Sequence, residues 1–194
     1  YRRRKAEAEL REIAHRDALT ALPNRPFLIQ QLDQVLTRRS MEQGSTDAIL
    51  FLDLDNFKII NDSLGHGAGD DLLNQVAVRL QECVRNHKSE RTRNRSTPAT
   101  VDRTGDETIR LGGDEFVVLL ERLEQREDAM RIARRIVQRV CEPFTLQDRL
   151  VTVGTSIGVA YIDDSLADAH EALRNADTAM YQAKNSGKGQ IAVF

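Results

Sequence analysis

Apolar side chains along this sequence alternate between helical spacing and short, nearly unbroken runs. Helical spacing occupies residues 27–36, 67–84, 127–141 and 166–185, and an opening segment, 2–16, shows it amid many charges. Strand-like runs occupy residues 47–55, 107–111, 115–120, 150–162 and 190–194. Helices and strands therefore interleave, which predicts an α/β (α+β) domain built on a central mixed sheet with helices packed against it.

One stretch breaks this pattern. Residues 86–102 are polar and nearly free of apolar side chains, so we expect a flexible loop there. The chain then divides into an N-terminal helix, 1–16, and one domain, 17–194, that contains the 86–102 insertion. The basic opening, YRRRK, would suit a segment cut from a longer, membrane-anchored protein.

The amino-acid composition excludes some classes of partner but indicates no particular function. The 194 residues are 40% hydrophobic with a net charge of −2, so nothing favours nucleic acid or an anionic membrane as a partner. The two cysteines, Cys83 and Cys141, lie in helix-like patterns and predict no disulfide framework. No apolar stretch of about 18 residues is present, so the segment is expected to be a cytoplasmic domain.

Two aspartates close the strand predicted at 47–55. Asp53 and Asp55 are separated by one residue, so on a strand both project to the same face. They stand near the end of a buried strand, where α/β folds commonly bind ligands, and a divalent cation would relieve their repulsion. The simpler alternative is that these acids end the strand and enter a turn.

A second acidic pair interrupts the apolar run RLGGDEFVVLL, residues 110–120. Its two glycines predict a tight hairpin, because glycine adopts positive φ without steric cost. The turn alone does not explain Asp114 and Glu115. If the hairpin lies beside the strand that ends at Asp53, these carboxylates converge and suit Mg²⁺ carrying a polyphosphate. An ordinary acidic turn is the alternative.

A glycine-rich stretch and two lysines complete the candidate chemistry. The stretch NDSLGHGAGD would let the backbone approach a ligand, and its Asn61 and Asp70 offer an amide and a carboxylate to a base edge such as that of guanine. Near the end of the chain, Lys184 and Lys188 could hold phosphates. The alternatives are a plain loop with Asp70 near a helix N-cap, and cations stabilising a helix C-terminus.

Taken in order, five motifs resemble the GGDEF family of diguanylate cyclases. They are DALTALPNR (17–25), LDLDNFKIINDSLGHGAGDDLL (52–73), RLGGDEFVVLL (110–120), SIGVA (156–160) and ADTAMYQAKNSGKG (176–189). The resemblance implies a nucleotide-cyclase-like, ferredoxin-related fold with a mixed or antiparallel sheet. It also implies that two GTP molecules are condensed into cyclic di-GMP, with release of two pyrophosphates, across a homodimer in which each domain binds one GTP.

The same resemblance assigns roles to individual residues. Metal binding, by Mg²⁺ or alternatively Mn²⁺, would fall to the carboxylates of Asp53 and Asp114 and the Leu54 carbonyl. Asp114 or Glu115 would help to deprotonate the attacking 3′-hydroxyl. The guanine-reading positions match Asn61 and Asp70, and the phosphate contacts match Lys58, Lys184, Lys188 and the backbone around Asn56 and Phe57.

The family's inhibitory RxxD motif is matched by RTGD, residues 103–106. The resemblance implies that Arg103 and Asp106 bind the product cyclic di-GMP, with Arg135 as a helper. Here the chain departs from the family pattern, because the 86–102 insertion precedes the motif and bears on how rigidly Arg103 is held.

Two other functions compete with the cyclase. A GGDEF module can be catalytically silent, binding GTP or cyclic di-GMP to regulate an attached downstream phosphodiesterase domain, with an upstream sensor acting through the N-terminal helix. The intact acidic motif favours the enzyme over that receptor. An adenylate-type cyclase on the same fold is the third possibility, against which Asn61 and Asp70 argue.

Overall fold

A five-stranded sheet forms the centre of the protein in the computed structural model, which describes residues 14–41, 46–94 and 105–194. The strands lie in the order β2-β3-β1-β6-β7, and all neighbours are antiparallel except β6 and β7. Their bounds are β1 Thr46–Asp55, β2 Glu107–Gly112, β3 Glu115–Leu123, β6 Gly154–Ile162 and β7 Ile191–Val193. A separate hairpin pairs β4 (Phe144–Leu146) with β5 (Arg149–Val151).

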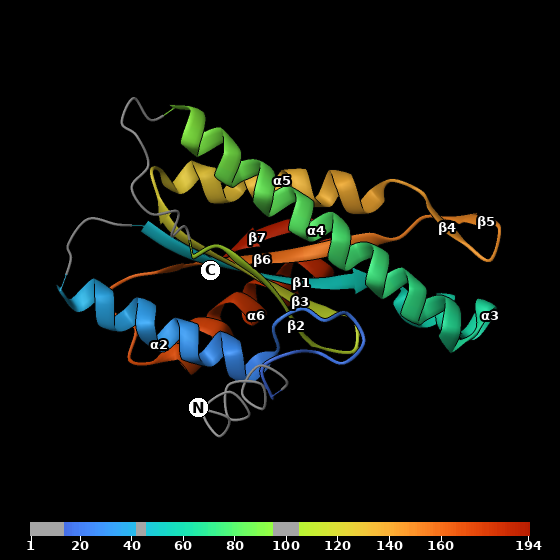
Figure 1. The fold of residues 1–194 in the computed structure, drawn as a ribbon, viewed down its shortest axis with the longest axis horizontal. Helices are drawn as coiled ribbons and strands as arrows, with labels where there is room; N and C mark the ends of the chain where they lie inside the picture. The colour runs from blue at the N-terminus through green and yellow to red at the C-terminus, as the bar shows by residue number, and fades with distance from the viewer. Residues whose placement is uncertain (1–13, 42–45, 95–104) are drawn as a thin grey trace, which may run out of the picture.

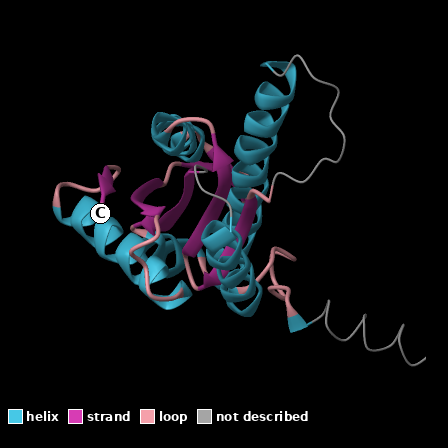
Figure 2. Ribbon diagram, turned by 90° about the vertical axis from the view of Figure 1, so that its left-hand side faces the viewer, coloured by secondary structure: helices cyan, strands magenta, loops and turns pink. Residues whose placement is uncertain are grey.

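Helices cover both faces of this sheet (Figures 1 and 2). On one face lie α4 (His66–Asn94) and α5 (Arg126–Cys141), and on the other lie α2 (Arg25–Met41) and α6 (Ala169–Asn185). The short α3 (Phe57–Leu64) joins β1 to α4. This is the predicted fold class, a helix-flanked mixed sheet, and it is confirmed. No helix in the described ranges is both long and apolar enough to cross a membrane.

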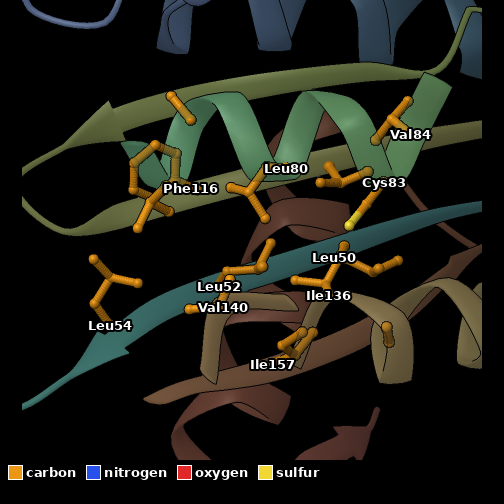
Figure 3. Packing of buried hydrophobic residues seen from close by; sticks show 14 of the residues in the cluster. Leu50, Leu52, Leu54, Leu80, Cys83, Val84, Phe116, Ile136, Val140 and Ile157 are labelled. Atoms are coloured by element: carbon orange, nitrogen blue, oxygen red, sulfur yellow. The ribbon is translucent and has the colours of Figure 1, made fainter. Parts of the chain in front are cut away.

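The central strand β1 is buried on both faces, which explains its nearly continuous apolar sequence. Leu50, Leu52 and Leu54 pack under α4 and α5, as Figure 3 shows, whereas Ile49 and Phe51 pack under α2 and α6. Because side chains alternate along a strand, the odd-numbered positions of β1 all face α6. Asp53 therefore projects towards α6.

Helix α6 approaches the sheet very closely at Gly158 of β6. A Cβ atom at this position would lie 2.1 Å from the Ala176 carbonyl oxygen and from the Met180 backbone nitrogen. The helix face towards the sheet is rich in alanine, including Ala172 and Ala179, which permits this contact. Glycine and alanine together therefore fix the height of α6 above the strands that carry the acids.

Helix α2 is anchored at its C-terminal end by buried charge. Asp47, which is fully buried, forms ion pairs with Arg38 at 2.7 Å and with Arg39 at 3.1 Å. Arg38 also pairs with Glu121 of β3. Breaking such a buried network leaves an uncompensated charge, so it holds the helix in one position. At the other end of α2, Arg25 lines one hollow with Phe51 and Glu115 of the sheet.

Several predicted boundaries were wrong. Residues 86–94, which were expected to belong to a loop over 86–102, are instead the last part of α4, which continues through Asn94. Its polar residues include arginine, lysine and glutamate, which extend a helix readily once it is nucleated. Residues 95–102 lie outside the described residues, and so do residues 2–13 of the helix predicted at 2–16. At the end of that predicted helix, Arg16 instead forms an isolated antiparallel bridge with Pro23. Asp70 is the fifth residue of α4 and not near its N-cap, since that helix begins at His66.

Two further elements differ from the prediction. The single strand expected over 150–162 is divided between β5 and β6. The first part pairs instead with β4 through a turn in which Gln147 and Asp148 have positive φ, 48° and 61°. Helix α3 was not predicted, although Phe57, Ile60 and Leu64 stand at helical spacing within its eight residues.

Candidate functional site

The acidic hairpin lies beside the strand that carries the first two aspartates. Asp53 of β1 is the direct cross-strand partner of Glu115 of β3, and the Leu54 backbone N–H donates to the Asp114 carbonyl at 3.3 Å. The turn between β2 and β3 needs its two glycines, since their φ values are +137° and +52°. The expected convergence of the two acidic motifs is therefore confirmed.

A buried arginine fixes the shape of this hairpin. Arg110 donates from Nη2 and Nε to the Gly113 carbonyl, at 2.8 and 3.2 Å, and from Nη1 to both carboxylate oxygens of Asp17, at 2.9 and 3.0 Å. Only a planar guanidinium can serve both partners at once. Asp17 in turn accepts from the Thr20 backbone N–H and hydroxyl. The start of the domain and the acidic turn are thus joined through one side chain.

Burial and mutual repulsion make the ionised carboxylates of the acidic cluster unfavourable, which favours binding of a cation. Burial raises the pKa of Asp53, and the charges of Asp114 and Asp55 raise it further against the lowering effect of the Lys184 ammonium. Burial likewise raises the pKa of Glu115, helped by Asp53, Asp177 and Asp114. Each of these carboxylates would be stabilised in its ionised form by a positive charge nearby.

Part of that positive charge comes from α6. The Lys184 ammonium lies 2.6 Å from Oδ1 of Asp53. Lys188, just beyond the helix, donates to the side-chain oxygen of Asn56 at 2.7 Å. The sequence prediction that these two lysines act at one site is consistent with this placement, since both reach the end of β1.

Asp55 has a different role from its neighbour. Its carboxylate accepts from the Ser156 hydroxyl and from the Gly189 backbone N–H, each at 2.8 Å. These bonds tie the turn after α6 to the end of β1 and so hold Lys188 near Asn56. Asp55 is therefore engaged in positioning the lysine turn, while Asp53 keeps its side chain for the acidic cluster.

The residues at the acidic cluster fit a hard divalent cation. Within the described ranges, no three Asp, Glu, His or Cys side chains are grouped so that they could hold a metal by themselves. The set assigned from the sequence is two carboxylates, Asp53 and Asp114, and the main-chain oxygen of Leu54, which are all oxygen donors of the kind that Mg²⁺ prefers. The mutual repulsion of the acids gives a bound cation a further advantage.

The predicted base-reading residues meet where α3 passes α4. The Asn61 side chain packs against Gly69 so closely that a Cβ there would lie 1.9 Å from Asn61 Oδ1. This oxygen is buried and has no hydrogen-bond partner among the residues that the structure describes. Asp70, the next residue, is exposed. A buried polar atom without a partner is unfavourable unless a ligand supplies one, so this corner fits a hydrogen-bonding ligand.

Comparison with known proteins identifies the family. A sequence profile described as "Diguanylate cyclase, GGDEF domain" matches residues 14–93 and 99–190. The chain belongs to the GGDEF domain family. The interruption of the match between residues 93 and 99 falls inside the segment predicted to be an insertion.

Individual relatives extend over almost all of this GGDEF domain. The bifunctional diguanylate cyclase/cyclic di-GMP phosphodiesterase MucR of Pseudomonas aeruginosa is 37% identical over 190 residues, 98% of this chain and 25% of that protein. The cyclic di-GMP phosphodiesterase PdeR of Escherichia coli is 34% identical over 192 residues, 98% of this chain and 26% of that protein. The GGDEF domain thus spans about a quarter of the length of these relatives.

A solved structure agrees with the fold. The crystal structure of the GGDEF domain of TpbB from Pseudomonas aeruginosa has a TM-score of 0.76 at 35% identity, covering 90% of this chain and 97% of that one.

The three predicted product-binding residues are placed differently from one another. Arg103 lies outside the described residues. Asp106 is only 1% exposed and accepts a hydrogen bond from the Glu121 backbone N–H at 2.8 Å. Arg135 of α5 donates to the Cys83 carbonyl of α4. The contacts seen for Asp106 and Arg135 are internal ones, and their role in product binding stays a prediction.

Sequence reasoning missed the part played by Arg110 and Asp17. Both lie inside motifs that were recognised, yet 93 positions separate them, and no local pattern shows that they meet. The available signal was the charge itself, since an arginine next to the glycine turn in an otherwise apolar strand needs a partner.

Proposed function

We propose that this GGDEF domain is a diguanylate cyclase, which condenses two GTP molecules into cyclic di-GMP and two pyrophosphates across a pair of domains. The observation that carries the proposal is the register between Asp53 and Glu115, which brings both acidic motifs to one point with Lys184 over it. The intact set of carboxylates supports the enzyme over a module that has lost its chemistry.

The reaction is two identical displacements at phosphorus. The 3′-oxygen of one GTP forms a bond to the α-phosphorus of the other, the bond to the β-phosphate breaks, and pyrophosphate departs. Mg²⁺, or alternatively Mn²⁺, held by Asp53, Asp114 and the Leu54 carbonyl, would neutralise phosphate charge and lower the pKa of the attacking hydroxyl.

The chain's own residues position the one GTP that each domain binds. Asn61 and Asp70 read the guanine edge, the buried Asn61 oxygen receiving a donor from the base. Lys58, Lys184 and Lys188, with the backbone N–H groups near Phe57, hold the triphosphate and neutralise the leaving pyrophosphate. Glu115 or Asp114 accepts the proton that leaves the 3′-hydroxyl.

The direct test is product formation. The chain is incubated with GTP and Mg²⁺ over a range of protein concentrations, and the nucleotides are separated by chromatography. We expect cyclic di-GMP and two pyrophosphates per turnover, a rate that rises more steeply than protein concentration, and no product from Asp114→Asn. ATP added in excess should neither be converted nor compete, whereas conversion of ATP would favour an adenylate-type cyclase.

A catalytically silent module is the second candidate, and the similarity to the phosphodiesterase PdeR favours considering it. Such a domain would bind GTP or cyclic di-GMP and regulate a downstream phosphodiesterase domain, under an upstream sensor. Binding of GTP without any cyclic di-GMP, at protein concentrations where the chain sediments as a dimer, would replace the cyclase with this function.

Product inhibition is part of the proposal. Arg103, Asp106 and Arg135 would bind cyclic di-GMP away from the acidic cluster and slow the reaction. Added cyclic di-GMP should then lower the initial rate of the native chain, whereas Arg103→Ala should keep its rate. An equal loss of rate in both proteins would show that the product acts elsewhere.

A further inference from the structure

A hollow of about 340 Å³ lies beside Glu115, between α6, the first residue of α2 and the sheet. Its lining includes the apolar Phe51 and Leu173 and charges of both signs, from Arg25, Arg174, Glu115 and Asp177. The charges of Arg25 and Asp177 both act on Glu115. The hollow therefore adjoins the acidic cluster, with which it shares Glu115.

Three of these charged side chains have no partner among the described residues. In the described ranges, no hydrogen bond or ion pair involves the side chains of Arg25, Arg174 or Asp177, and all three are exposed. Arg174 and Asp177 are three residues apart on α6, a spacing that permits an ion pair, yet they form none. Elsewhere in the fold, arginines close to acids are paired, as at Asp47 and Asp17.

The balance of charge indicates what kind of partner fits. Two acids beside two arginines do not favour a free anion, and no three metal-ligating side chains are grouped there among the described residues. A partner that carries both signs itself would satisfy all of them. A second copy of this chain is such a partner, because a two-fold axis places each surface against itself.

The exposed stripe of α6 has the symmetry that such a contact needs. His170, Arg174, Asp177 and Tyr181 follow one another at helical spacing on one face, and all are exposed. In an antiparallel pair of helices whose two-fold axis passes midway between Arg174 and Asp177, each Arg174 faces the other Asp177. The same axis places His170 opposite Tyr181, which is 64% exposed.

We propose that α6 and the hollow beside it are the surface on which a second copy of this GGDEF domain docks, with Arg174 of each copy against Asp177 of the other. The proposal rests on the proposed function in one respect, since the condensation needs two domains in contact. It adds the surface and the charge pair, and it places Glu115 of both copies at the junction.

Charge exchange tests this arrangement. Arg174→Glu creates two like-charge contacts by symmetry, and so does Asp177→Arg, so each variant alone should associate at least about tenfold more weakly in sedimentation. An equimolar mixture of the two variants should form a heterodimer with native affinity, and the double variant in one chain should associate normally. Arg134→Glu, an exposed reversal on α5 across the sheet, should leave association unchanged.

The outcomes separate this inference from the proposed function. Weakened single variants and a restored mixture support the surface, and product formation that follows association shows that it is the catalytic pairing. Restored association without product from any protein would leave the surface established and refute the cyclase. Single reversals that associate like the native chain, a mixture that fails to recover while each variant still binds GTP, or a native chain that stays monomeric would overturn the surface.

Discussion

Gly69→Ala should separate substrate binding from stability in this domain. The substitution adds one Cβ atom, which would lie 1.9 Å from Oδ1 of Asn61 and 3.2 Å from Cζ of Phe57. Ordinary contact begins at 3.4 Å, so the Asn61 amide has to retreat by about 1.5 Å. The obstacle is the end of a side chain and not backbone, so the helices themselves can stay in place.

The size of the effect follows from that displacement. A hydrogen bond of about 2.9 Å stretched by about 1.5 Å is no longer a hydrogen bond. Leaving a buried amide without its partner costs about 1–3 kcal/mol, so the Kd for GTP should rise about 5- to 150-fold. Stability should not fall, because alanine is up to about 1 kcal/mol better than glycine within a helix.

The assay uses a matched control from the same helical turn. Gly67 has no atom within 4 Å of its would-be Cβ, so Gly67→Ala adds the same methyl without touching Asn61. Calorimetric titration with a non-hydrolysable GTP analogue gives the Kd of both variants, and urea unfolding gives their stability. Equal affinity in Gly69→Ala and Gly67→Ala would refute the role of Asn61 in reading the base.

Three other substitutions test separate parts of the site. Arg110→Lys keeps the charge, but a lysine cannot bind both Asp17 and the acidic turn. The kcat should therefore fall about tenfold or more while the Kd for GTP changes less. An unchanged kcat would contradict this role of Arg110. Gly158→Ala drives a methyl into the backbone of α6, and urea unfolding should show a loss of about 3 kcal/mol or more, or no folded protein. Glu115→Gln should be more stable than the native chain near pH 7, since the raised pKa of Glu115 makes its ionised form unfavourable in the fold. The gain should shrink as the pH falls through that raised pKa, because the native side chain is then protonated, and a gain that grows towards acid would contradict the sign.

The sequence alone was sufficient to predict the helices and strands whose hydrophobic pattern is regular. The buried strand β1 shows as an apolar run because both of its faces are covered, and α5 and α6 show a helical period because each buries one face. The glycine turn before Asp114 was also predictable, since its positive φ values leave few other residues possible. These features depend on neighbouring residues, and local sequence therefore determines them.

Tertiary structure decided what depends on distant partners. The division of residues 150–162 between two sheets follows from the pairing of β5 with β4, and no local signal marks it. The use of Arg110 for Asp17, the engagement of Asp55 by Ser156, and the empty side of Gly69 that Asn61 fills are all contacts between separate elements. Their physical cause is packing at a specific register, which composition and periodicity do not record.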